Sequence, residues 1–215
     1  MPFFTRKNKK GLPTPPEMVQ AMKEHNVPQW YIDSLQKIRY MFPKAHAAAY
    51  AIDAIRLGWY KIYYPVEFYA AYFTAAPDGF DSEIVMGGPQ RVKNRMDEIK
   101  KMGRDATQKE KDQADALLLV NEYYARGYGF LPVNLYKSHA SKFLPENGKI
   151  RLPFSSLAGV GENAAISLMR ARDENEIYSI EGVRETAKVS KSVIETLERN
   201  GVFAGMTQTN QLSLF

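Results

Sequence analysis

Prolines and glycines divide the first part of this 215-residue chain into a succession of helices. After Pro43, residues 45–64 carry apolar side chains at helical spacing. Pro65 ends this stretch and begins the next helix, because proline fits the first helical turn but not a helix interior. Upstream, residues 17–38 are typical of two short helices that are interrupted at Asn26–Pro28.

Prolines and glycines also mark the ends of a second pair of predicted helices. Pro89 opens one helix and Gly103 closes it. Thr107 and Glu110 form a T-x-x-E capping box, which predicts another helix that ends at Gly127. Up to this point we expect the chain to be almost entirely helical.

Short β-type segments follow, so the predicted fold is mostly α with a small β-hairpin element. Asn147–Gly148 lies between two of these segments and is a hairpin signal. Further on, residues 162–172 and 190–199 are typical of small helices, and Ser179 is a suitable N-cap for a short helical turn. The change in character predicts a domain boundary near residue 130.

Composition argues against several classes of protein. No apolar run approaches the roughly 18 residues that a membrane span needs, and no stretch of signal-peptide length follows the basic first residues. We therefore expect a cytoplasmic location and no membrane partner. The chain has no cysteine and three scattered histidines, which excludes disulfides and thiolate zinc sites and argues against a transition-metal site.

The positive charge of the chain is concentrated at one end. Residues 1–46 hold eight Lys/Arg and three Asp/Glu, whereas the remainder holds 21 of each, so the net charge of +5 belongs to the first block. A basic block beside a balanced body suggests an anionic partner, and nucleic acid is the usual one. A solvated arm is the alternative, and charge alone does not separate the two.

The stretch LPFSSLAGVGENAAISLMRAR, residues 152–172, predicts a phosphate-binding hairpin. Gly159 and Gly161 permit a tight turn without Cβ atoms, so that N–H groups face one phosphate, and the next helix adds its positive end. Such a hairpin holds the DNA backbone without reading bases. VSKSVIETLERNGVF repeats the helix-then-glycine arrangement. The alternative is an ordinary turn between two packed helices. Nearby cations are candidates for further phosphate contacts: Lys142, Lys149, Arg151, Arg170 and Arg172.

A second candidate site lies in RYMFPKAHAAAY, residues 39–50. Arg39, Lys44 and His46 are placed just before or within the start of a helix, where cations suit a polyphosphate. Tyr40 offers a flat face to a base. The alternative is a plain helix start with a solvated lysine and a histidine packed on the surface.

The last stretch, NQLSLF at residues 210–215, is apolar and has two explanations. It packs back into the protein's own core, or it is a peptide that fills a groove on another protein.

Taken together, these stretches resemble the bacterial C-family replicative DNA polymerases of the PolC type. YMFPKAHAAAY, its following helix and YYPVEFYAAYFT look like the fingers domain of that family. LPFSSLAGVGENAAISLMRAR looks like its helix–hairpin–helix, and NQLSLF looks like a sliding-clamp-binding motif. The likeness covers essentially all 215 residues. The first and last motifs are specific to the group, whereas the GVG motif alone is not.

The resemblance implies three parts. Residues 1–129 would be a distal fingers domain, residues 130–203 a duplex-DNA-binding domain with a helix–hairpin–helix, and residues 204–215 a flexible tail that binds the sliding clamp. The implied partners are double-stranded primer–template DNA, the clamp and a deoxynucleoside triphosphate.

The family's functional residues carry over only where this sequence matches. Tyr40 would lie against the nascent base pair, while Lys44 and His46 would contact the incoming nucleotide, with Arg39 a weaker candidate. A phosphate of the duplex would be held by Gly159, Val160 and Gly161. The clamp pocket would receive Gln211, Leu212, Leu214 and Phe215.

The resemblance also implies DNA-directed DNA polymerase activity, a nucleotidyl transfer in DNA replication. That reaction needs closely placed carboxylates that hold two Mg²⁺ ions, and the family carries them in a palm domain upstream. No D-x-D occurs in this sequence. The chain is therefore expected to be a C-terminal piece of a longer polymerase, inactive alone, with no cofactor of its own and a location at the nucleoid.

Two other functions stay open at this stage. One is a stand-alone, non-catalytic adaptor that links duplex DNA to the clamp. The other is a small helical protein whose hairpin only packs, in which case bulky residues at Gly159 and Gly161 would not lower DNA affinity.

Overall fold

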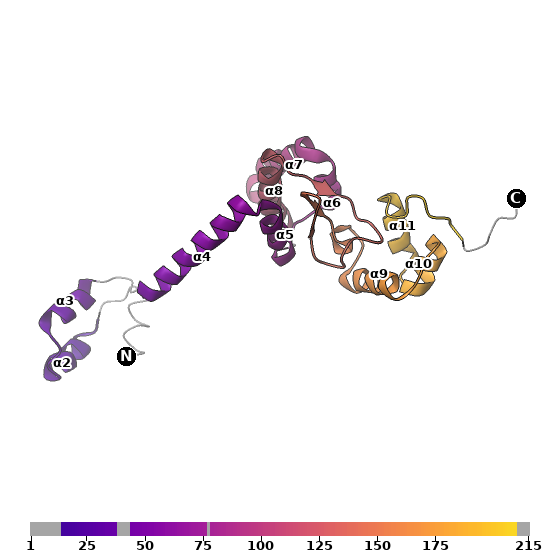
Figure 1. Ribbon diagram of the computed structural model, residues 1–215. Helices are drawn as coiled ribbons and strands as arrows, with labels where there is room; N and C mark the ends of the chain where they lie inside the picture. Colours follow the sequence, from indigo (N-terminus) through magenta and orange to yellow (C-terminus); the bar gives the residue numbers. More distant parts are fainter. Residues whose placement is uncertain (1–13, 38–43, 77, 210–215) are drawn as a thin grey trace, which may run out of the picture. The chain divides into compact units, whose positions relative to one another are not determined.

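A computed structural model describes residues 14–37, 44–76 and 78–209, and the described chain is mostly helical, as predicted (Figure 1). It divides into two compact units between Gly58 and Trp59.

The first unit contains two short helices, α2 (Pro16–Glu24) and α3 (Gln29–Lys37). They enclose a small core of their own, which is made by Met22, Ile32 and Leu35. The chain turns between them at Asn26, where φ is +55°. The predicted pair of helices and the position of their interruption are confirmed.

The long helix α4 (Lys44–Tyr63) forms where the apolar spacing predicted it. None of its residues is buried by the described chain, and Ile55 and Ile62 are 71% and 64% exposed. Its last turn is held to Glu122, whose carboxylate lies 2.8 Å from the Lys61 ammonium. The predicted apolar face of α4 is thus present, and its side chains are exposed in the described chain.

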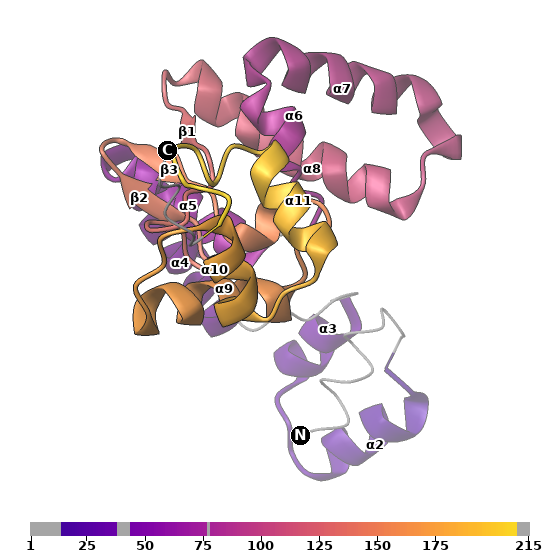
Figure 2. The ribbon, with the colours of Figure 1, turned by 90° about the vertical axis from the view of Figure 1, so that its right-hand side faces the viewer.

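In the second unit, the end of α4 is followed by α5 (Pro65–Ala75), whose Tyr69 and Phe73 are fully buried. Three helices follow, and Figure 2 shows the last two running side by side. Their bounds are α6 (Ser82–Met86), α7 (Gly88–Met102) and α8 (Gln108–Ala125). The predicted capping box at the start of α8 is confirmed, because the Thr107 and Glu110 side chains each bond the other residue's backbone N–H.

A three-stranded sheet lies between the helices of the second unit, in the order β1 (Phe130–Leu131), β3 (Lys149–Arg151), β2 (Leu144–Glu146). The antiparallel β2–β3 hairpin confirms the prediction at Asn147–Gly148, where both residues have positive φ as a type I′ turn requires. β1 lies where short β-type segments were expected, but its parallel pairing with β3 was not predicted.

Three helices, close together in Figure 1, follow the sheet: α9 (Glu162–Glu174), α10 (Ile180–Ala187) and α11 (Lys191–Arg199). Their buried faces belong to one apolar cluster that runs from Val66 to Phe203. Residues on both sides of position 130 share this core. The functional division at residues 129 and 203 stays a prediction.

No described helix is long and apolar enough to cross a membrane. Within residues 14–37, 44–76 and 78–209, no three His, Cys, Asp or Glu side chains gather as a metal ion would need.

Candidate nucleic-acid interface

The predicted hairpin is the turn that leads into α9, and it has a rigid apolar base. Gly159 has a φ of +92°, a left-handed conformation that residues with a Cβ rarely adopt. Leu157 and Val160 are both 4% exposed and hold the turn on the core. The Val160 N–H donates to the Leu157 carbonyl at 3.0 Å. The turn therefore presents its exposed glycine backbone to solvent from a fixed position.

The backbone conformation does not require glycine at position 161, the N-cap of α9. Its φ of −70° suits any residue, and a Cβ built on it would meet no protein atom within 4 Å. It has no side chain to cap the helix, although its carbonyl accepts the Ala165 N–H at 2.9 Å. The space in front of the first N–H groups of α9 is therefore open to the oxygens of an anion.

The turn between α10 and α11 resembles this hairpin, with a left-handed residue two positions before the N-cap of the next helix. Lys188, with φ +51°, takes the place of Gly159. The N-cap Ser190 has φ −68° and ψ 157°, against −70° and 161° for Gly161. The corresponding segments are A-G-V-G at residues 158–161 and A-K-V-S at residues 187–190. The unit therefore carries two hairpins of similar design, each followed by a helix.

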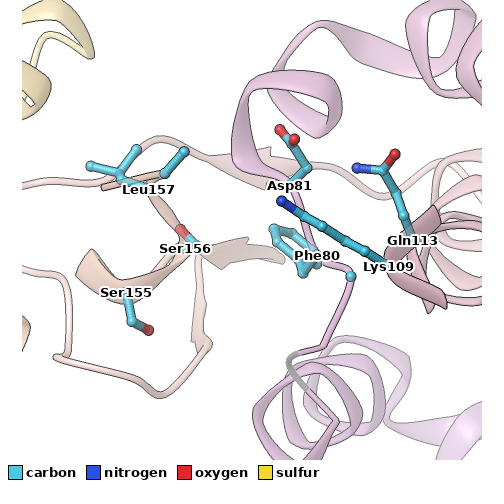
Figure 3. A pocket seen from close by; sticks show the side chains of 9 residues that line it. Phe80, Asp81, Lys109, Gln113, Ser155, Ser156 and Leu157 are labelled. Carbon is cyan, nitrogen blue, oxygen red and sulfur yellow. The ribbon is translucent and has the colours of Figure 1, made fainter. Parts of the chain in front are cut away.

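A cavity of about 200 Å³ lies beside the first hairpin (Figure 3). One wall includes Ser156 and Leu157, and the opposite wall includes Phe80, Asp81 and Lys109. Figure 3 shows Lys109 reaching from α8 toward the loop that carries Phe80 and Asp81. The Asp81 carboxylate accepts an N–H at the start of α6 at 3.1 Å. Because its two charged side chains have opposite signs, this cavity does not favour an anion.

The cationic side chains predicted to assist the hairpin differ in their exposure and in the contacts that they already make. Lys142 and Lys149 are exposed. Arg170 is exposed as well, and its ion pair with Glu174 is long at 4.0 Å, so it exchanges partners at little cost. Arg172 instead donates to two backbone carbonyls at 2.6 and 3.1 Å and holds α9 against the preceding loop.

Arg151 lies inside the fold. The residue is 8% exposed, and its Nε and Nη2 donate to the two Glu146 carboxylate oxygens at 2.7 and 2.8 Å. Its Nη1 donates to the Pro132 carbonyl at 2.6 Å. A bidentate pair of this kind joins β2 to β3. The predicted contact of Arg151 with a phosphate would require this pair to open, and it stays a prediction.

Glu146 makes the stability of the sheet depend on pH. The Arg151 guanidinium, with help from the Lys137 ammonium, lowers the pKa of Glu146 from 4.5 to about 2. Because the folded-state pKa is the lower one, the stabilisation is complete above the unfolded-state pKa and is lost as the pH falls toward about 2.

Replacing Glu146 with glutamine is expected to lower the free energy of unfolding by about 2 kcal/mol at pH 7, because Arg151 loses its counter-charge. The deficit should shrink at pH 3, because the Glu146 carboxyl of the unfolded wild-type chain is protonated there and must lose its proton on folding. Urea unfolding at both pH values measures this. Glu174→Gln, which removes only an exposed pair, serves as the control and should change stability by less than about 0.5 kcal/mol. A deficit of equal size at pH 7 and pH 3 would contradict the assignment.

The predicted nucleotide-binding residues are only partly described. Lys44 and His46 are exposed on the first turn of α4, and the His46 ring packs edge-to-face on Tyr50 at 4.4 Å between centroids. Arg39 and Tyr40 lie outside the described residues. The clamp-binding residues Gln211, Leu212, Leu214 and Phe215 also lie outside them. These assignments stay predictions.

Sequence reasoning did not identify the turn at Lys188 as the equivalent of the glycine hairpin. Lysine carries none of the conformational signal that glycine does, since left-handed backbone is uncommon for it. A comparison of the chain with itself would have aligned A-G-V-G with A-K-V-S.

The chain is similar to known proteins over nearly all of its length. Residues 127–212, which include both hairpins, match the family described as helix-hairpin-helix motif. Proteins called DNA polymerase III PolC-type are 45% identical in Halalkalibacterium halodurans, 46% in Clostridium perfringens and 44% in Bacillus subtilis. These alignments cover 97–99% of this chain but only 14–15% of each relative. The chain therefore belongs to the PolC-type DNA polymerase III family, of whose members it matches a part.

Proposed function

We propose that this chain holds double-stranded DNA by its sugar–phosphate backbone, as part of a replicative DNA polymerase of the PolC type. The observation that carries the proposal is the pair of similar turns at Gly159–Gly161 and Lys188–Ser190, each with a left-handed residue two positions before an N-cap of nearly equal φ and ψ. Each hairpin leads into a helix, and the first N–H groups of a helix bind phosphate oxygens. No side chain caps those of α9, whereas the Ser190 hydroxyl takes the Val193 N–H of α11 at 3.4 Å.

Two hairpins suit a duplex better than one does. The first hairpin leads into α9 and the second leads into α11, and α10 packs against both of these helices. Backbone N–H groups contact phosphates and not base edges, so binding is expected to be independent of sequence. Exposed lysines and one arginine add charge around the hairpins: Lys149, Arg170, Lys188 and Lys191.

We also propose that the start of α4 contacts the incoming deoxynucleoside triphosphate. Lys44 and His46 are exposed on the first helical turn, where cations and the positive helix end favour phosphate. Arg39 and Tyr40, just before this turn in the sequence, would complete the contact. The proposal is supported by the motif and by the similarity to PolC-type polymerases across this region.

The uncovered apolar side of α4 supports assembly into a larger polymerase. A 20-residue helix with no buried residue and with Ile55, Trp59 and Ile62 exposed is unusual for a protein that acts alone. The relatives contain about six times more chain than is matched here. We propose that other parts of such a polymerase cover this helix and hold the Mg²⁺ ions for nucleotidyl transfer. The cytoplasmic, nucleoid-associated location stays a prediction.

Gln211, Leu212, Leu214 and Phe215 are proposed to bind the sliding clamp. A glutamine that bonds the rim of a groove and three apolar side chains that fill it suit a short peptide segment. This proposal is supported by the motif alone.

Duplex binding is tested by the dependence of affinity on salt. If two to four phosphates are contacted, a plot of log K against log[salt] should have a slope of about −2 to −4. The affinity should be equal for duplexes of unrelated sequence. Fluorescence anisotropy with labelled duplexes at several NaCl concentrations measures both properties. An absence of binding at low salt, or a strong preference for one sequence, would refute the proposal.

A further inference from the structure

The cavity beside the first hairpin contains a buried amide that lacks a partner. Gln113, which is 7% exposed, lines this cavity of about 200 Å³. The Arg95 Nε donates to its Oε1 at 2.8 Å. Because a guanidinium only donates, the amide oxygen must face Arg95, and the Nε2 must face the opposite side. Figure 3 shows this nitrogen turned toward Lys109 and Asp81, and no acceptor in the described chain bonds it.

Two charged side chains join this amide in the cavity. One oxygen of the Asp81 carboxylate accepts the Ile84 N–H at 3.1 Å, which fixes the carboxylate in place as the cap of α6. Its other oxygen has no bond to any described residue. Lys109 is exposed and makes no ion pair with another described side chain. The cavity therefore offers a fixed acceptor, a fixed donor and a mobile cationic donor.

The size and the walls of the cavity suit one flat ring system. Its volume lies below the roughly 300–1,000 Å³ of pockets that hold drug-sized ligands. Phe80 and Leu157 supply apolar surface on opposite walls. A ring between them would contact apolar atoms with its faces and the polar groups with its edge.

We propose that this cavity binds a guanine base, a contact distinct from the proposed phosphate contact of the hairpins. The N1–H and the N2 amino group of guanine are neighbouring donors, and they match the Asp81 carboxylate. The next group along the same edge, the O6 carbonyl, matches the Gln113 Nε2 and the Lys109 ammonium. Guanine is neutral, so it suits a cavity whose two charges have opposite signs.

The other bases satisfy these groups less well. Adenine and cytosine each present a single amino group beside a ring nitrogen that only accepts, and thymine presents one N–H between two carbonyls. Opposite any of them, the Asp81 carboxylate would lose a bond or face another acceptor, and a buried polar group without its partner is costly.

Such a base reaches the cavity from one of two sources: a free guanine nucleoside or nucleotide, or an unpaired guanine in a DNA strand. Ala158 of the cavity wall directly precedes Gly159 of the hairpin, so a strand held there by its phosphate brings a base close to the cavity. An unpaired base also costs least to extrude from a duplex. Only the strand source rests on the proposed DNA binding.

Guanosine is the first probe, because it has no phosphate with which to bind the hairpins. Added to the ¹⁵N-labelled 215-residue chain, it should shift the NMR resonances of the Gln113 side-chain amide, with a Kd on the order of 0.1 mM. Inosine, which lacks the N2 amino group, should bind about tenfold more weakly.

Asp81→Asn tests the donor match and keeps the cap of α6, because asparagine caps helices as well as aspartate does. The new amide oxygen must accept the Ile84 N–H, so the NH₂ group faces the cavity. We expect guanosine affinity to fall about tenfold or more and the variant to prefer xanthosine, which has a carbonyl where guanosine has the amino group. Lys109→Gln should weaken guanosine binding several-fold, whereas Lys111→Gln, which changes an exposed lysine of α8 outside the cavity, should not.

Duplexes that carry one unpaired guanine or one unpaired adenine decide the source. A several-fold preference for the guanine duplex that disappears in Asp81→Asn assigns the base to the strand, whereas equal affinities beside guanosine binding assign it to a free nucleoside or nucleotide. If guanosine shifts no resonance in the millimolar range and the two duplexes bind equally, or if Asp81→Asn changes neither result, the proposal is wrong. If no duplex binds at all, the proposed DNA contact of the hairpins fails, and guanosine binding alone then decides for or against the cavity.

Discussion

Replacing Gly161 with leucine is expected to lower affinity for duplex DNA about tenfold or more, while the folded protein keeps most of its stability. The backbone of Gly161 has an ordinary φ of −70°, and a Cβ there would meet no protein atom within 4 Å. Leucine is a poorer N-cap than glycine, so the free energy of unfolding should fall by no more than about 1 kcal/mol. The added side chain would occupy the space that a phosphate needs to reach the first N–H groups of α9.

Gly129→Leu is a matched control for this experiment. Gly129 lies in the same matched region, and a Cβ on it likewise meets nothing within 4 Å, so the same substitution is made without a clash. It is expected to leave DNA affinity unchanged. Anisotropy with a labelled duplex at low salt, beside urea unfolding of each variant, separates binding from folding. Equal affinity of the Gly161 variant and the wild type would mean that the hairpin only packs.

Gly159 is less informative as a target. Its φ of +92° makes any side chain strained, so a substitution there disturbs the turn as well as the DNA contact. The two glycines of one motif thus have different reasons to be glycine. Gly159 is needed for the backbone conformation, and Gly161 for the approach of a ligand.

Local signals predicted most of the elements. The capping box of Thr107 and Glu110 and the Asn147–Gly148 turn are decided by bonds within a few residues, and both formed as predicted. The helix breaks at Pro65 and Gly103 are local as well, and they also formed.

Features that depend on distant partners were not predictable in this way. The sequence does not distinguish Arg151 from an exposed arginine. Only the fold brings Glu146 and the Pro132 carbonyl around the Arg151 guanidinium. The acceptors for the first N–H groups of α10 come from residues almost 30 positions later. No periodic pattern marks Thr207 or Gln208, because they bond through their backbone carbonyls, which every residue has.

Deleting residues 211–215 is expected to abolish measurable binding to the sliding clamp, a loss of about 100-fold or more. Burial of Leu212, Leu214 and Phe215 would supply about 1.5–3 kcal/mol each before the cost of ordering the segment, so little affinity would remain without them. The double variant Leu212→Ala, Phe215→Ala keeps the tail length and should lose nearly as much. Isothermal titration with the clamp measures these affinities.

DNA affinity supplies the internal control for the tail variants. Both hairpins are held by the core and by α10, so the deletion should leave binding to a bare duplex unchanged. A joint loss of clamp and DNA binding would indicate damage to the fold instead of loss of a contact. Clamp affinity that survives the deletion would place the contact elsewhere on the chain.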